Sequence, residues 1–423
     1  MAISDRVPQV FRAGQLRNKI LFTIAMLFVF RIGAHVPIPG INANAIQSLL
    51  SGQLFGLFDT ISGGAFKRFS IFAMSITPYI NASIILQLLT IVVPRLEELH
   101  KEGEEGRKKI AEYTRYATVL FAGIQAIGIT IVLARVGAVE ERNFLGYLSI
   151  AISMTAGTLL LMWIGEMITE KGIGNGISLI IFAGIIARIP SGLSTIIQEW
   201  QGGIIGVINI IALVAVVIVV IVGVIAVNEG QRRIPVQYAK RMVGRRMYGG
   251  ASSFLPLRVN SAGVIPIIFA MSLVYFPHII GSWMDPSNGY NTFLKQYFSS
   301  GSVAYNIVYA LLIIFFTYFY VAIIFNPNDV ADNIKKNAGF IPGIRPGRPT
   351  AEYIDRVLTR LTLAGGIFLA VIAILPNIVI ALTGISGLWF GGTALLIVVG
   401  VALDTMKQIQ SNLLLRNYEG FIK

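Results

Sequence analysis

The chain has 423 residues, of which 55% are hydrophobic and only 13% are charged, and its mean hydropathy is +0.73. About a quarter of the residues of a soluble domain are charged, so this composition excludes an ordinary soluble protein and a disordered one. The net charge of +13 fits the enrichment of Lys and Arg in the retained loops of membrane proteins. The chain has no cysteine, which excludes disulfides, thiolate metal sites and cysteine catalysis.

The apolar residues occur in runs of roughly 20 residues, each long enough to cross a bilayer. The first 18 residues contain three arginines but no apolar run and no cleavage site, so the first span is expected to act as its own signal. Ten runs predict membrane-spanning helices, in chain order at 20–37, 70–93, 115–134, 148–168, 174–190, 204–227, 261–280, 304–325, 357–376 and 388–406.

Lys and Arg are distributed unevenly between alternate loops. The termini and the loops after even-numbered spans contain 26 of these residues, whereas the loops after odd-numbered spans contain 6. Positive charge accumulates in cytoplasmic loops, so both termini are expected in the cytoplasm. Ten spans divide into five plus five, and an odd number per half gives the halves opposite orientations. The sequence predicts an all-α polytopic membrane protein with two inverted five-helix halves, residues 1–190 and 191–423.

The second predicted span of each half contains an internal proline. Pro78 and Pro266 each remove a backbone hydrogen bond and are expected to kink their helices. Interrupted helices at matching positions in two halves indicate a central pathway. Prolines are also common in membrane helices in general, and this explanation is equally good when the prolines are considered alone.

The polar residues in the middle of the predicted spans are neutral. Four lie in the second span and one in the third: Thr77, Asn81, Ser83, Gln87 and Gln125. Interhelical hydrogen bonds explain any one of them, but four in one helix favour a seam that can separate. A secondary transporter for a small solute would also have inverted repeats and broken helices. Such a transporter needs a charged or strongly polar site near mid-bilayer, and the spans place no charge there.

The sequence contains no complete motif of the enzyme classes that were considered. No Walker A sequence and no His-Glu-x-x-His motif is present. The stretch 384–387, Gly-Ile-Ser-Gly, matches a short pattern of intramembrane serine proteases, but all three histidines precede it and lie at loop edges, so no base follows the serine. The glycines of Gly172-Ile-Gly-Asn-Gly176 fit a tight turn better than a phosphate loop, because no strand precedes them.

Two long basic loops, 228–260 and 326–356, project on the positive side. Retention in the cytoplasm explains their charge, but not the close combination of Gly, Pro and Arg in them. Basic protrusions of this size also suit docking to an acidic protein or to RNA phosphates. Between the first two spans, residues 55–68 are too short and too rich in glycine to cross a bilayer. They fit either a surface-lying segment or a re-entrant one.

Long motifs in all ten spans resemble the SecY family, whose members are the central subunits of the bacterial Sec protein-conducting channel. The stretches that carry the resemblance include Pro37-Ile-Pro-Gly40, Ser62-Gly-Gly-Ala65, 78–89, 165–178, Tyr238-Ala-Lys-Arg241, 255–260, Pro342-Gly-Ile-Arg-Pro-Gly347 and Phe390-Gly-Gly-Thr393. The resemblance implies a passive channel for unfolded secretory polypeptides with an hourglass pore between the two halves, and it implies neither enzymatic activity nor a cofactor.

The family's site residues can be carried over to matching positions of this sequence. A ring of apolar side chains at the waist of the pore would comprise Ile76, Ile80, Ile177, Ile181, Ile268 and Ile397. A plug at about 57–69, including Ile61, Ser62, Gly63 and Gly64, would close the pore from outside. The second and third spans against the seventh and eighth would form a lateral gate that releases membrane helices into lipid, with Asn81, Gln87, Gln125 and Asn260 as its polar residues.

The resemblance also implies partners and a location. Arg245, Arg246 and Arg345 would dock the motor ATPase SecA or a translating ribosome, through acidic surfaces or rRNA phosphates. Two small membrane subunits, SecE and SecG, would bind at the periphery, and signal sequences and nascent chains would pass through the pore. The expected location is the bacterial plasma membrane.

Overall fold

The computed structural model describes residues 14–42, 62–203, 205–238, 241–243, 246–248, 252–284, 288–299, 302–383 and 392–419. The helices before residue 205 are α2 (Gly14–Gly33), α5 (Thr77–Val92), α6 (Pro94–Lys101), α7 (Glu104–Val136), α8 (Phe144–Lys171), α9 (Gly176–Ala187) and α10 (Ile189–Gln201). The later helices are α11 (Val207–Glu229), α12 (Ile265–Trp283), α13 (Gly289–Tyr297), α14 (Val303–Ile324), α15 (Pro327–Lys336), α16 (Arg348–Thr383) and α17 (Gly392–Glu419).

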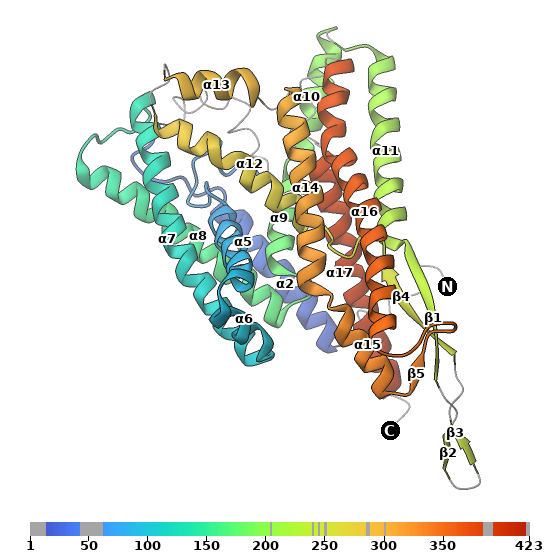
Figure 1. Ribbon diagram of the computed structural model, residues 1–423. Coiled ribbons are helices and arrows are strands. Elements are labelled where there is room, and N and C mark those ends of the chain that lie inside the picture. The colour runs from blue at the N-terminus through green and yellow to red at the C-terminus, as the bar shows by residue number, and fades with distance from the viewer. Residues whose placement is uncertain are drawn as a thin grey trace.

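The helices form two groups with α12 between them (Figure 1). In one group α7 packs against α5 and α8, and α9 packs against α2 and α8; in the other, α11, α14 and α17 surround α16. Helix α12 contacts α5 and α7 of the first group and α14 of the second, and α9 also contacts α17. The start of α2 and the end of α17 lie at the same end of the molecule as the strands, while α10 and α13 lie at the opposite end (Figure 1).

Apolar length agrees with a polytopic membrane protein. Within the described ranges, seven helices are long and apolar enough to cross a membrane, or eight if α5 and α6, bent by 98°, form one broken span. Helices α2 and α12 coincide with the first and seventh predicted spans, but do not count among the seven, since α2 contains three basic residues and the apolar part of α12 is short. The number of ten spans remains a prediction.

The second predicted span begins later than expected. Residues 70–76 form turns, and the helix starts only at Thr77, because Phe69 and Ser75 have left-handed backbone angles (φ 47° and 53°) that interrupt a helix. The expectation that Pro78 and Pro266 kink their helices is wrong. Both lie in the first helical turn, of α5 and of α12, where the missing N–H of proline has no partner to lose.

Five short strands, absent from the sequence prediction, lie in the two basic loops. They are β1 (Gln231–Tyr238), β2 (Arg241–Val243), β3 (Arg246–Tyr248), β4 (Ser252–Arg258) and β5 (Gly339–Phe340). The central strand β1 pairs antiparallel with β4 along its length and with β5 at its end. Ile234, Leu257 and Ile341 are buried in a small apolar core beneath this sheet. The two basic loops, about one hundred residues apart in sequence, therefore form one folded unit.

Candidate functional site

Isoleucines from four separate helices meet in the largest apolar core of the molecule. Of the six predicted ring residues, five belong to this core and are at most 8% exposed: Ile76, Ile80, Ile181, Ile268 and Ile397. Ile76 directly precedes α5, Ile80 and Ile268 lie in the first turns of α5 and α12, and the remaining two lie on α9 and α17. Two of these helices, α5 and α12, begin within this core.

The sixth ring residue, Ile177, is only partly buried and packs at the edge of the same core. Its Cδ1 lies 2.9 Å from the position that a Cβ on Gly165 would take. The side chain therefore packs against α8, on which Gly165 lies, as well as against the isoleucine core.

The described part of the predicted plug, Ser62–Phe69, is called the plug segment below. Gly63 and Gly64 have φ values of 68° and 86°, which side chains rarely tolerate. A Cβ on Gly63 would also lie 2.9 Å from the Cα of Gly184 on α9. Because both residues are glycines, the backbone of the plug segment can contact the backbone of α9. Ala65 is fully buried in the core that contains the ring residues. The plug segment thus lies against α9, the helix that carries Ile181. Ile61 lies outside the described residues.

The predicted gate helices are in contact in this structure. Helix α12 packs against both α5 and α7, and the guanidinium of Arg135, at the end of α7, donates a hydrogen bond to the carbonyl oxygen of Met284 just after α12 (3.0 Å). Asn81, Gln87 and Gln125 are half-buried on α5 and α7. Within the described part of the chain, the buried Oε1 of Gln87 has no hydrogen-bond partner. Such a buried acceptor without a partner is uncommon in folded proteins.

Asn260 has a different environment from the other predicted gate residues. It is 6% exposed, and its side-chain amide donates to Oδ1 of Asn228 at the end of α11 (2.9 Å) and to the carbonyl oxygen of Gly263 (3.2 Å). These bonds tie the start of α12 to α11 and do not involve α5 or α7.

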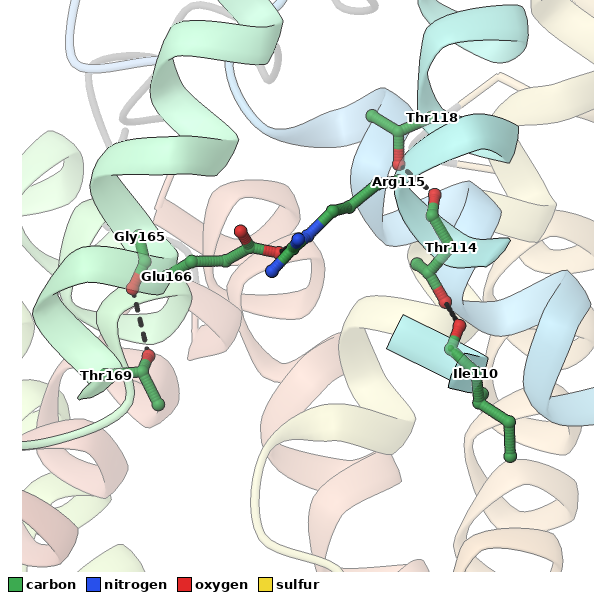
Figure 2. A network of polar contacts seen from close by, with 7 residues as sticks. All are labelled: Ile110, Thr114, Arg115, Thr118, Gly165, Glu166 and Thr169. Carbon is green, nitrogen blue, oxygen red and sulfur yellow. Dashed lines mark hydrogen bonds and ion pairs between the residues drawn. The ribbon is translucent and has the colours of Figure 1, made fainter. Parts of the chain in front are cut away.

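An ion pair joins α7 and α8 (Figure 2). Nε of Arg115 lies 2.9 Å from Oε1 of Glu166, and both side chains are partly exposed, at 47% and 21%. Around the pair, the hydroxyls of Thr114, Thr118 and Thr169 donate hydrogen bonds to carbonyl oxygens one turn earlier in their own helices. These three hydroxyls are therefore satisfied within their helices and do not compete for the ion pair.

Removing only one partner of this ion pair is expected to be worse than removing both. Arg115→Gln leaves the Glu166 carboxylate unpaired and should destabilise the protein by about 1 kcal/mol more than the double variant with Glu166→Gln, a small effect because water reaches both groups. Thermal unfolding of the four purified chains of this double-mutant cycle measures the coupling. Strictly additive losses would contradict an energetic interaction between the two side chains.

The structure describes two of the three predicted docking arginines. Arg345 is exposed on the turn after β5, and its carbonyl oxygen accepts a hydrogen bond from the hydroxyl of Thr350 (2.9 Å). The flanking Gly343 and Gly347 have positive φ values of 83° and 98°, which shape this turn. Arg246 is the first residue of β3, which pairs with β2 in a hairpin. Arg245 lies outside the described residues.

Side chains that the sequence did not single out clamp the tight turn between α8 and α9. The Thr23 hydroxyl on α2 accepts a hydrogen bond from the N–H of Ile173 (3.0 Å), and Oε1 of Gln408 on α17 accepts one from the N–H of Gly174 (2.8 Å). The repeated glycines indicated a tight turn at this place, but no feature of the sequence identified these partners. Among the described residues no group of three His, Asp or Glu is arranged to hold a metal ion.

Known proteins resemble this chain over nearly its whole length. A family model described as SecY matches residues 70–406. The protein translocase subunit SecY of Mycobacterium bovis is 49% identical over 437 aligned positions, which cover 97% of this chain and 98% of that protein. The subunits of the same name from Streptomyces galbus and Corynebacterium glutamicum are 48% and 49% identical, and each comparison covers 98% of this chain and 99% of the relative.

Solved structures share the fold at lower identity. A structure described as that of a protein conducting channel superimposes with a TM-score of 0.68 at 20% identity, covering 93% of this chain and 92% of the other. A canine ribosome-channel complex from the endoplasmic reticulum contains a chain that matches with a TM-score of 0.64 at 19% identity and the same coverage. Together with the family match over most of the sequence, these findings show that the chain belongs to the SecY family.

Proposed function

We propose that this chain is the channel subunit of a protein translocase, which passes unfolded polypeptides across a membrane and releases membrane-spanning helices sideways into lipid. It is a passive pore and not an enzyme, as its family membership indicates. One observation carries the proposal for the site: isoleucines from α5, α9, α12 and α17 converge in a single buried cluster.

The isoleucines would form the waist of the pore. A narrow collar of apolar side chains excludes water, and with the water it excludes ions. The same side chains are displaced when an unfolded polypeptide passes, because no specific contacts between the ring and the polypeptide have to form or break. Isoleucine suits this task because its branched side chain has few rotamers and keeps the collar in shape.

The plug segment would close the pore on one side of this collar. Its contact with Gly184 and the burial of Ala65 in the isoleucine core support this position. In a related structure, the plug domain of the SecY protein is described as stabilising the closed state of the translocation channel and maintaining a membrane seal. We extend the same role to residues 57–69 of this chain.

The lateral gate would be the interface of α5 and α7 with α12 and α14, which separates the halves 1–190 and 191–423. Opening has to break the hydrogen bond between Arg135 and Met284. A helix leaving the pore for lipid passes between these four helices.

The expected membrane is the bacterial plasma membrane, with both termini in the cytoplasm. The charge asymmetry of 26 to 6 between alternate loops supports this orientation, as does the position of both described chain ends at the same end of the molecule as the strands of the basic loops (Figure 1). The sheet and Arg345 would then face the ribosome or SecA, and the small subunits SecE and SecG would bind the helices from outside. A ribosome-bound channel is among the structural relatives.

Reversing the charge of Arg345 is expected to weaken docking. Arg345→Glu should lower the affinity of the reconstituted channel for ribosomes by about tenfold and reduce its dependence on salt, because one phosphate contact is lost. Co-sedimentation at several salt concentrations measures both effects.

Arg142→Glu is the matched control, since Arg142 is equally charged and exposed but lies between α7 and α8, at the far end of α7 from the cytoplasmic helix α6. Equal losses in the two variants would show that only overall charge matters and would contradict a docking role for Arg345.

Transport by purified components tests the function itself. The chain is reconstituted with SecE and SecG into vesicles, and a secretory precursor is added with SecA and ATP. The proposal predicts that the precursor becomes protected from added protease and that protection requires this chain. Uptake of small solutes by the same vesicles without precursor protection would instead favour the transporter interpretation.

A further inference from the structure

The C-terminal end of α2 contacts the base of the plug segment at several points. The rings of Phe30 and Phe72 stack with centroids 6.1 Å apart, and a Cβ on Gly33 would collide with the Phe72 ring. The backbone after α2 pairs with the backbone after the plug segment: the N–H of Ile38 donates to the carbonyl oxygen of Phe69 (2.9 Å), and that of Ile71 donates to Val36 (3.0 Å). These contacts hold the chain at residues 69–72 firmly against α2.

A separate contact holds the other end of the plug segment. Nη1 of Arg31 on α2 donates a hydrogen bond to the carbonyl oxygen of Gly63 (2.9 Å), 32 positions along the chain. Gly63 is the residue whose left-handed backbone lies against Gly184 of α9. The guanidinium therefore binds the plug segment at the point where it touches the wall of the pore.

Different kinds of contact hold the two ends of the plug segment. The base is fixed by ring stacking and paired backbone. Within the described residues, Arg31 of α2 holds the end at Gly63 through a charge-assisted hydrogen bond, and such bonds are stronger than neutral ones, particularly where water is scarce. Arg31 is itself half-buried, and Phe69, at the base, has the left-handed backbone (φ 47°) of a sharp bend. When the bond at Gly63 breaks, this end of the plug segment loses its charged hold on α2 but keeps its packing against Gly184 and the burial of Ala65.

We infer that Arg31 is a plug-positioning residue: by binding the Gly63 carbonyl it keeps the plug segment against the pore wall until a passing polypeptide displaces it. This inference rests on the proposed channel function and adds to it a named contact that sets how often the resting channel opens. It assigns to an arginine at the end of a spanning helix a task other than setting orientation.

The leak of ions through the resting channel tests the inference. Arg31→Gln and Arg31→Met remove the charged donor and are expected to raise the ion flux of proteoliposomes without precursor by about tenfold, the change that loss of one such bond produces in a closed-to-open ratio. Arg31→Lys keeps a charged donor and should restore most of the resistance to leakage. Arg17→Gln is the control, since Arg17 is an exposed charge at the opposite end of α2 from Arg31 and should leave the leak unchanged.

A second measurement follows the plug segment directly. The chain has no cysteine, and Ser62 is fully buried, so Ser62→Cys gives a single thiol that a membrane-impermeant maleimide should label slowly. Combining it with Arg31→Gln should speed labelling by about the same factor as the leak. This readout needs no precursor, so it remains valid if transport, and with it the proposed function, fails.

Three outcomes would overturn the inference. Unchanged leak and unchanged labelling in an assembled Gln or Met variant would do so, as would an equal increase in the Arg17→Gln control. If both neutral variants failed to assemble and Lys restored assembly, Arg31 would be a folding residue and the inference would be wrong.

Discussion

Replacing Ile181 with serine is expected to raise the ion conductance of the resting channel by at least about tenfold. Ile181 is 2% exposed and lies in the core where four helices meet. A hydroxyl in an otherwise apolar collar holds water, and a hydrated constriction conducts ions that a dry one excludes. Serine can return its hydroxyl to the preceding turn of α9, so the helix itself is expected to persist. Single-channel recording in planar bilayers, without precursor, measures the effect.

Ile180→Ser is the matched control for this substitution. Ile180 is adjacent on α9 and fully buried in the same core, but it is not one of the predicted ring residues. Both variants lose a similar amount of buried apolar surface and should be similarly destabilised. Only the Ile181 variant should leak. An equal conductance in the two variants would mean that leakage follows from loosened packing and not from the ring.

Gly157→Ala is expected to cause a large loss of stability, about 3 kcal/mol or more, because an added Cβ would collide with the carbonyl oxygen of Ile71. That oxygen belongs to backbone, and the backbone at residues 69–72 is fixed against α2, so it cannot move aside cheaply. The yield of folded protein from membranes and the midpoint of thermal unfolding measure the loss.

Gly123→Ala distinguishes this collision from a general effect of alanine. Gly123 lies in the interior of α7 with no atom within 4 Å of an added Cβ. Alanine favours a helix over glycine by up to about 1 kcal/mol, so this variant should be as stable as the parent or slightly more stable. A Gly157 variant that behaved like the Gly123 variant would contradict the close approach of α8 to the chain before α5.

The long apolar spans were predictable from the sequence because their boundaries depend on local chemistry. The predicted span 304–325 corresponds to α14 (Val303–Ile324), and 148–168 lies within α8, since in each case charged or polar residues end a continuous apolar run. The start of α5 was not predictable in this way. Residues 71–74 are apolar and read as helix, but contacts with α2 and α8 hold them in turns, and these contacts come from residues far away in sequence.

The strands and the sheet were missed for a similar reason. Strand β5 has two residues and forms only because β1, about one hundred positions earlier, offers a free backbone edge. Composition indicated the basic charge of both loops but not their pairing. The loops fold on each other through the buried Ile234 and Ile341.

The candidate site came from resemblance more than from pattern. The spacing of Ile76 with Ile80, and of Ile177 with Ile181, indicates a shared helix face, but most helices here are apolar on every side and many faces have such spacing. The hydrogen bond from Arg31 to Gly63 could not be predicted at all, because it depends on how the plug segment turns back toward α2. The glycines of this segment indicated only that it does not cross the bilayer as a helix.

The most direct test of the channel account places a translocating polypeptide at the isoleucine ring. A single cysteine replaces Ile181, the chain is reconstituted with its partners, and a secretory precursor that carries its own cysteine is stalled midway through export. The account predicts a disulfide between the two, since a polypeptide in the pore brings its thiol within bonding distance of the ring. If the precursor is protected from protease yet never forms a disulfide with cysteine at Ile76, Ile181 or Ile397, these residues do not line the pore and the account is wrong.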